Sequence, residues 1–280
     1  EETGMTGAFA LKPGLLKADI LLNMDSEDEG ELYIGCAGGM NTSAKMNYKE
    51  EDIPSDHKAF KLSVKGLKGG HSGLDIHLGK GNANKIMNRF LWYAHNKLEI
   101  RLSDVEGGNL RNAIPREAFV KLFVPAAKEK KFLDVVREYE DIFKYEFAGT
   151  EPDLKFVAEN TNVPHKVMDR DTQGRFIRMI YGIPNGVMRM SIDMEGVVET
   201  STNLAIVKAN NGQIDVLCLV RSSVDSAKMS VGYMTQSVME LAGAEVIHDG
   251  IYPGWKPNPE SPILKTMKEV YHSKFNKIPD

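Results

Sequence analysis

The sequence contains very little cysteine. Among its 280 residues only Cys36 and Cys218 are of this type, too few for a disulfide framework or a thiolate metal cluster, so a reducing cytoplasm is the expected location. The sequence also has no large excess of one sign of charge. Its net charge of −4 gives no basis for a surface that binds nucleic acid or anionic membranes. No apolar run approaches the roughly 20 residues of a membrane-spanning helix. The composition therefore predicts a globular protein with no nucleic-acid or membrane partner.

The sequence also lacks an initiator methionine. It opens with Glu1-Glu2-Thr3-Gly4 and stops at Asp280, directly after an apolar helical pattern at 263–275. This predicts a segment cut from a longer polypeptide. A site assembled from residues far apart in that polypeptide would then be incomplete here.

Glycine is abundant in one place, between Val64 and Lys85. The stretch follows an alternating strand pattern at 60–64 and leads into a helical apolar stripe. Glycine permits backbone conformations closed to other residues, so His71, in Gly69-Gly70-His71-Ser72-Gly73, is well placed to meet a ligand. The alternative is an ordinary strand-to-helix loop with a polar surface histidine. The stripe consists of Ala83, Ile86, Met87, Phe90, Leu91 and Ala94.

Acidic side chains near the start form a second candidate group. Glu1 and Glu2 are adjacent and point in different directions, so one carboxylate can face a metal and the other a substrate. An apolar run at 18–25 ends in Asp25, as expected of a buried parallel strand with a metal-ligating carboxylate at its carboxyl end. The alternative is that all three are solvated surface carboxylates.

Two further polar positions are candidates for anion binding. The turn-rich segment 107–116 contains Arg111, Asn112 and Arg116, which can grip a carboxylate, although asparagine and proline also simply make turns. Arg221 ends a predicted strand, where it can form a structural salt bridge or reach an anionic ligand.

The order of patterns predicts an α/β protein interrupted by an α+β domain. Strands are expected at 18–25 and 32–37, and from about residue 40 strands alternate with amphipathic helices in an antiparallel arrangement. The latter pattern resembles two ferredoxin-like units in tandem. The first unit is assigned 60–64, 83–94, 98–103, 118–124 and 129–147. The second is assigned 154–157, 169–181, 203–208, 213–220, 226–242 and 244–248, with Asn211-Gly212 as a hairpin turn.

Five motifs in order resemble the aminoacyl-histidine dipeptidases (peptidase D, cytosolic Xaa-His dipeptidases) of the co-catalytic zinc aminoacylase/carboxypeptidase superfamily. The motifs are Glu1-Glu2-Thr3-Gly4-Met5, Asn23-Met24-Asp25-Ser26-Glu27, Gly69-Gly70-His71-Ser72-Gly73, Leu110-Arg111-Asn112-Ala113-Ile114-Pro115 and Tyr252-Pro253-Gly254-Trp255. The resemblance implies a zinc-binding catalytic domain, residues 1–39 and 251–280, interrupted by a lid or dimerisation domain, residues 40–250. It also implies a homodimer that hydrolyses dipeptides with two Zn²⁺ ions, with Mn or Co as possible substitutes.

The same resemblance implies roles for individual residues. Glu1 matches the general base, and Glu2 and Asp25 match ligands of the two zincs. His71 matches a lid histidine that stabilises the oxyanion, often from the partner subunit in dimeric members. Asn112 and Arg221 match residues that hold the substrate's C-terminal carboxylate.

The remaining metal ligands of that family have no counterparts here. They would lie before residue 1 and after residue 280, so this chain by itself is expected to bind zinc poorly and to be inactive. Two alternatives stay open: a related aminoacylase or carboxypeptidase with another substrate, or a non-catalytic module for dimerisation or peptide binding.

Overall fold

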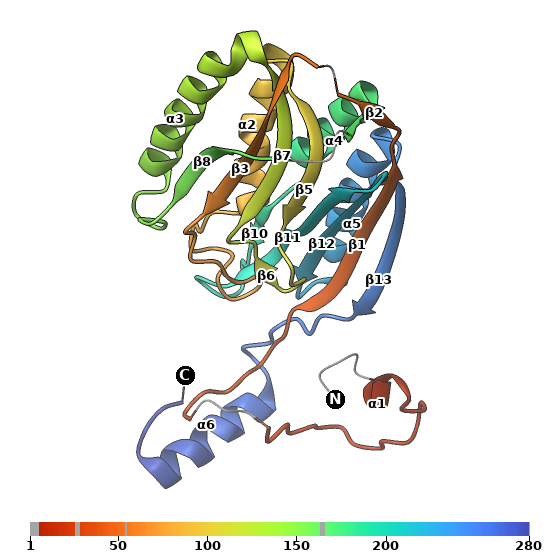
Figure 1. The fold of residues 1–280 in the computed structure, drawn as a ribbon. Helices are drawn as coiled ribbons and strands as arrows, with labels where there is room; N and C mark the ends of the chain where they lie inside the picture. The colour runs from red at the N-terminus through yellow and green to blue at the C-terminus, as the bar shows by residue number, and fades with distance from the viewer. Residues whose placement is uncertain (1–5, 26–28, 54, 163–165, 280) are drawn as a thin grey trace.

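The structure of the protein, a computed structural model, describes residues 6–25, 29–53, 55–162 and 166–279 (Figure 1). Among these residues nine strands form one antiparallel sheet, in the order β13-β1-β12-β11-β5-β7-β3-β8, with β10 added beside β11. Helices α2, α3, α4 and α5 lie against one face of this sheet (Figure 1). The predicted antiparallel α+β arrangement is therefore confirmed.

The elements predicted from residue 60 onward are present, whereas the strands at 38–47 and 186–190 were not predicted. The strands of the sheet are β1 (Gly38–Asn47), β3 (His57–Lys65), β5 (Arg101–Gly107), β7 (Ala118–Pro125), β8 (Lys155–Asn160), β10 (Gly186–Met190), β11 (Val198–Asn210), β12 (Gln213–Ser222) and β13 (Glu245–Tyr252). Two short pairs join β2 (Glu50–Asp52) to β9 (Lys166–Met168) and β4 (Gly70–His71) to β6 (Ala113–Ile114). The helices are α1 (Thr6–Phe9), α2 (Ala83–Lys97), α3 (Glu129–Glu146), α4 (Arg170–Gly182), α5 (Asp225–Leu241) and α6 (Pro262–Phe275), with a 3₁₀ turn at Ala126–Lys128.

The sheet contains two ferredoxin-like units. In the first unit the chain runs β3-α2-β5-β7-α3-β8, and the strands stand in the order β8-β3-β7-β5. The second runs β1-α4-β11-β12-α5-β13, and its strands stand in the equivalent order β13-β1-β12-β11. Both therefore have the split βαβ topology, in which the first strand lies between the third and the fourth.

The units are nested rather than placed in tandem, which corrects the sequence prediction. Residues 154–157 were assigned to the start of the second unit, but β8 pairs with β3 and closes the first, with Val64 opposite Phe156. The second unit begins at β1, before the first, and continues at α4 after it. An alternating pattern marks a strand but not its neighbour in the sheet, and that neighbour is chosen by packing.

The two units are joined by β5 and β11. Val207 pairs with Gly107 and Ala209 with Val105, so the ladder continues across the junction. Asn84, on α2, donates weakly to the carbonyl oxygens of Gly107 and Leu204 at 3.4 Å each, one in either unit. A side chain at position 107 would overlap the Asn84 amide oxygen, so glycine is required there.

Helix α2 shows why the sequence forms these elements. Asn82 caps the helix, its side chain accepting from the backbone N–H groups of Asn84 and Lys85. The predicted apolar stripe is fully buried against the sheet, with Phe90 at the centre of an aromatic cluster. Its partners there are Phe132, Tyr139 and Phe156. Edge-to-face ring contacts of this kind add to the area that burial removes from water.

Segments 6–25, 29–37 and 253–279 lie outside the sheet (Figure 1). The strands predicted at 18–25 and 32–37 are wrong for the described chain: 18–25 is exposed and has no ladder, and the second segment contributes only a bridge between Cys36 and Trp255. A buried parallel strand needs neighbours on both edges and cover on both faces, and no described segment supplies them here. Helix α6 confirms the predicted helix at 263–275. No helix in the described ranges is long and apolar enough to cross a membrane.

Candidate functional site

The glycine-rich loop of the first unit meets the second unit at His71 and Arg221. His71 ends β4 and pairs with Ala113 of β6, while Arg221 lies near the end of β12. The Nε2 atom of His71 lies 3.4 Å from Nη2 of Arg221. The fold thus brings together two of the predicted site residues that are 150 positions apart in sequence.

The protonation state of His71 follows from its backbone neighbours. The backbone N–H groups of Gly73 and Leu74 donate to Nδ1 at 3.3 and 3.1 Å, so this nitrogen carries a lone pair and no proton. Burial, followed by the charge of Arg221, lowers the pKa of His71 below its ordinary value, although Asp75 opposes the shift. Around neutral pH the imidazole is therefore uncharged, and Nε2–H is a donor aimed towards Arg221.

The half-buried guanidinium of Arg221 has only weak neutral partners. Its Nε lies 3.4 Å from the hydroxyl of Ser72, and its Nη1 lies 3.5 Å from the hydroxyl of Tyr252. Since His71 Nε2–H is itself a donor, the 3.4 Å contact between His71 and Arg221 is not a hydrogen bond. Within the described ranges no carboxylate forms an ion pair with Arg221, so the position suits an anion from outside.

Glycine is needed where the loop approaches this pair. A Cβ atom at Gly73 would lie 3.2 Å from both Arg221 Cδ and His71 Cε1, a contact that would force one of them to move. Asp75 closes the same turn: its carboxylate accepts from the backbone N–H of His71 at 2.8 Å and pairs with Lys80 at 3.2 Å. The prediction for this loop was that its glycines adopt backbone conformations closed to other residues, and Gly69, at φ 64°, does so.

Glu151 anchors both ends of the loop. Its side chain is 1% exposed, and its two oxygens accept from the backbone N–H groups of Lys68, at 2.7 Å, and Gly81, at 2.8 Å. Glu151 and Tyr252 are absent from the residues predicted for the site. Their roles depend on partners far away in sequence, and nothing next to Glu151 in the chain marks it.

Asn112 was predicted to hold the substrate's C-terminal carboxylate together with Arg221. Its backbone carbonyl accepts from the N–H of Ser72 at 2.8 Å, which helps to hold the loop beside His71. Its side chain is exposed, and no described contact joins it to Arg221. The neighbouring Arg111 donates to Asn41 at 3.5 Å.

The predicted acidic residues do not form a metal centre in the described chain. Glu1 and Glu2 lie outside the described residues, and Asp25 is exposed, with its backbone N–H donating to Asn23. In the part of the chain that the structure describes, no three histidine, cysteine, aspartate or glutamate side chains converge on a common point. The described residues alone do not fit a zinc ion, and no chemical step through a metal is derived from them.

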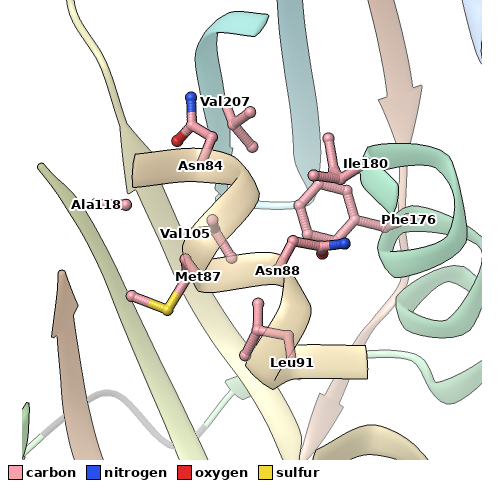
Figure 2. Close-up of a pocket in the computed structure, with 9 residues that line it drawn as sticks. All are labelled: Asn84, Met87, Asn88, Leu91, Val105, Ala118, Phe176, Ile180 and Val207. Carbon is pink, nitrogen blue, oxygen red and sulfur yellow. The ribbon is translucent and has the colours of Figure 1, made fainter. Parts of the chain in front are cut away.

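Two cavities lie elsewhere in the described part of the chain. The first, of about 10 Å³, lies in the core at the junction of the two units, surrounded by α2, α4 and the strands below them (Figure 2). Asn88 reaches its edge, donates to the carbonyl of Ile177 at 3.0 Å, and leaves its own Oδ1 without a partner among the described residues. The volume is about that of one water molecule, so no substrate fits.

The second cavity is open and holds about 360 Å³ beside Lys80, Lys85 and Arg89. Each of these cations is already engaged: Lys80 with Asp75, Arg89 with Glu146, and Lys85 with backbone carbonyls of the α4 end. It is therefore a poorer anion site than Arg221, which has no such partner.

The chain is similar to known peptidases. Residues 62–151, from β3 to just beyond α3, match the peptidase dimerisation domain family. The whole chain is 44% identical over 280 residues to the cytosol non-specific dipeptidase of Escherichia coli (strain K12), and it spans 58% of that protein.

A solved structure agrees with this assignment. The aminoacylhistidine dipeptidase of Vibrio alginolyticus matches all of the chain with 46% identity and a TM-score of 0.95, and the chain spans 57% of its length. The chain is thus similar along its whole length to these two dipeptidases, as its motifs predicted, and its residues 62–151 match a peptidase dimerisation domain. It spans somewhat more than half the length of both relatives.

Proposed function

We propose that the protein to which this chain belongs is a metal-dependent dipeptidase that cleaves Xaa-His and other dipeptides, and that His71 and Arg221 bind its substrate. One observation carries the proposal: the neutral imidazole donor of His71, on a loop fixed by Glu151, stands 3.4 Å from the guanidinium of Arg221, which has no carboxylate partner among the described residues. The names of the two relatives support the substrate class.

The proposed roles follow from donor chemistry. His71 Nε2–H donates to the oxyanion that develops on the scissile carbonyl, and a donor preset for this atom is worth about 2.7–4 kcal/mol of barrier. Arg221 binds the free carboxylate at the substrate's C-terminus, with Asn112 as a second contact. A longer peptide has no carboxylate at that place, so the pair favours dipeptides.

The metal part of the proposal comes from the sequence motifs. Glu1 is the general base, and Glu2 and Asp25 are ligands of two divalent metal ions, with zinc as the first candidate and Mn or Co as substitutes. When bound, such ions polarise the carbonyl and supply hydroxide near neutral pH. Residues 1–39 and 251–280 would belong to the catalytic domain and 40–250 to the lid, a division supported by the sheet that runs from Gly38 to Tyr252.

The assembly and location are part of the same proposal. The match to a dimerisation domain supports a homodimer, and the name of the Escherichia coli relative supports a cytoplasmic location. His71 faces Arg221 of its own chain, so these two proposed substrate contacts come from a single copy. A dimer would therefore not be needed to bring these two side chains together.

Hydrolysis by the intact protein tests this function. We expect cleavage of Ala-His but not of its C-terminal amide, and sensitivity to a chelator that is reversed by zinc. An Arg221→Met variant should raise the KM for Ala-His at least tenfold. Preference for N-acyl amino acids over dipeptides would instead favour a related aminoacylase, and absence of both activities would favour a non-catalytic module.

A further inference from the structure

We propose that Tyr252 is a third substrate-binding residue of this site, and that its hydroxyl donates to the carboxylate held by Arg221. This inference rests on the proposed function, because it concerns the same anion. It assigns a ligand-binding role to a residue that stands in the motif Tyr252-Pro253-Gly254-Trp255 but was given no role by the resemblance.

The sheet register places Tyr252 and Arg221 on the same face. Tyr252 pairs with Gly39 across β13 and β1, Gly39 pairs with Arg221 across β1 and β12, and Arg221 pairs with Ser201 across β12 and β11. Directly paired residues on antiparallel strands point to the same side of a sheet. These residues therefore form one row across four strands, with the guanidinium in the middle.

Gly39 makes room for the tyrosine ring to cross the row. A Cβ atom at this position would lie 2.5 Å from Cε1, Cζ and Oη of Tyr252, closer than real side chains approach. The ring thus occupies the space above Gly39 and extends its hydroxyl to 3.5 Å from Arg221 Nη1. Any larger residue at 39 would displace the ring from the guanidinium.

The contact leaves the phenolic proton available. Arg221 has only donors, so it donates to the Tyr252 oxygen, and the tyrosine O–H is left to donate elsewhere. Among the described residues the hydroxyl has no acceptor. A carboxylate offers about four lone-pair positions on two oxygens, enough to accept from Arg221 and from Tyr252 together.

A buried lysine fixes the tyrosine backbone. Lys228, on α5, is 2% exposed, and its ammonium group donates to the Tyr252 carbonyl at 2.6 Å and to Asp225 at 2.7 Å. Asp225 also accepts from the backbone N–H of Gly254 at 3.0 Å. A buried charge is costly unless its partners are well placed. Here those partners hold the end of β13, where the chain leaves the sheet, directly behind the tyrosine.

Binding measurements separate this inference from the function on which it rests. The probes are the reduced-peptide-bond analogue of Ala-His, which cannot be hydrolysed, and its C-terminal amide. Calorimetry would give the Kd of each for the wild-type protein and for the Arg221→Met, Tyr252→Phe, Gly39→Ala and Tyr233→Phe variants. Tyr233 is exposed on α5 and serves as the matched control.

We expect the wild-type protein to bind the acid more tightly than the amide, Tyr252→Phe to reduce that preference about tenfold, and Tyr233→Phe to leave it unchanged. Gly39→Ala should reproduce the loss while retaining the hydroxyl, which keeps the test valid if Tyr252→Phe folds poorly. A wild-type preference that survives in Arg221→Met would overturn the proposed function. Loss of preference in Arg221→Met with full preference in Tyr252→Phe would overturn this inference alone.

Discussion

The buried carboxylate of Glu151 accepts a hydrogen bond from the backbone N–H of Gly81 at 2.8 Å, and its other oxygen accepts from Lys68 at 2.7 Å. These two amides bracket the loop that presents His71. One side chain in the connection between α3 and β8 therefore sets the position of a loop whose nearer anchored residue, Gly81, is 70 positions away in sequence.

Replacing this carboxylate tests its anchoring role. In Glu151→Gln one oxygen becomes an NH₂ group that faces a backbone N–H, which leaves a buried donor unpaired and should cost about 1–3 kcal/mol of unfolding free energy. Urea denaturation measures the change. Glu138→Gln, on the exposed face of α3, is the matched control and should change stability by less than about 0.5 kcal/mol. Equal effects of the two variants would contradict the anchoring role.

The donor role of His71 can be separated from its structural role. In His71→Asn the side-chain oxygen can still accept from Gly73 and Leu74, but the donor at Nε2 is lost. We expect kcat of the intact protein on Ala-His to fall about 10²–10³-fold, the effect typical of removing one oxyanion donor. The KM and the melting temperature should change little. A large fall in melting temperature with kcat retained would mean that the imidazole only supports the loop.

The contact between His95 and Gln173 predicts loss of stability in mild acid. Gln173 Oε1 accepts from Leu102 N–H, so its Nε2 is the donor and His95 Nδ1, at 2.9 Å, is the acceptor. Burial, then Arg170 and Arg178, lower the pKa of His95 below its ordinary value of 6.5. The unfolded chain thus takes up this proton at higher pH than the folded chain. The stabilisation that neutral His95 gives to the folded chain is complete above pH 6.5, and it is lost as pH falls through the lowered pKa of His95.

Urea denaturation between pH 7.5 and pH 5 measures this dependence. His95→Gln should flatten part of the decline below pH 6.5, because a neutral amide does not titrate. His272→Gln, which removes an exposed histidine of α6, should leave the pH profile as it is. Identical profiles for wild type and His95→Gln would show that His95 does not couple protonation to folding.

Lys85 stabilises the end of α4. Its ammonium group donates to the carbonyls of Ile180 at 2.7 Å, Tyr181 at 3.2 Å and Ile183, acceptors that the helix itself leaves unused. Burial lowers the pKa of Lys85 to about 8, so the group is still charged at pH 7. Lys85→Met should therefore cost about 2–3 kcal/mol at pH 7. The exposed Lys268→Met is the control, and equal stability of both variants would argue against this capping role.

Local patterns predicted most elements of the sheet and its helices. The apolar stripe from Ala83 to Ala94, the hairpin turn at Asn211-Gly212 and the helix at 263–275 are all present as predicted. These signals depend on neighbours within one or two turns, so they can be recognised from the sequence alone. The run at 18–25 shows the limit: apolar composition alone does not form a strand where no neighbouring strand pairs with it.

The candidate site could be predicted only in part. His71 stood out because glycines surround it, and Arg221 because it ends a strand. Glu151 carries no such mark, and the motif that contains Tyr252 gave this residue no role, because one acts across a loop of the first unit and the other across Gly39. The general base Glu1 and the metal ligands Glu2 and Asp25 remain predictions, with Glu1 and Glu2 outside the described residues.

The sequence by itself determined the periodicities, the caps and turns, and the glycine-rich loop with its imidazole, since each depends on residues close together in the chain. Only the tertiary structure decided that one ferredoxin-like unit is inserted into the other, and that β5 meets β11 at their junction. That arrangement places His71 beside Arg221, which in turn contacts Tyr252. The physical reason is that strand pairing and burial act between segments more than a hundred residues apart, and no local pattern records which segments will meet.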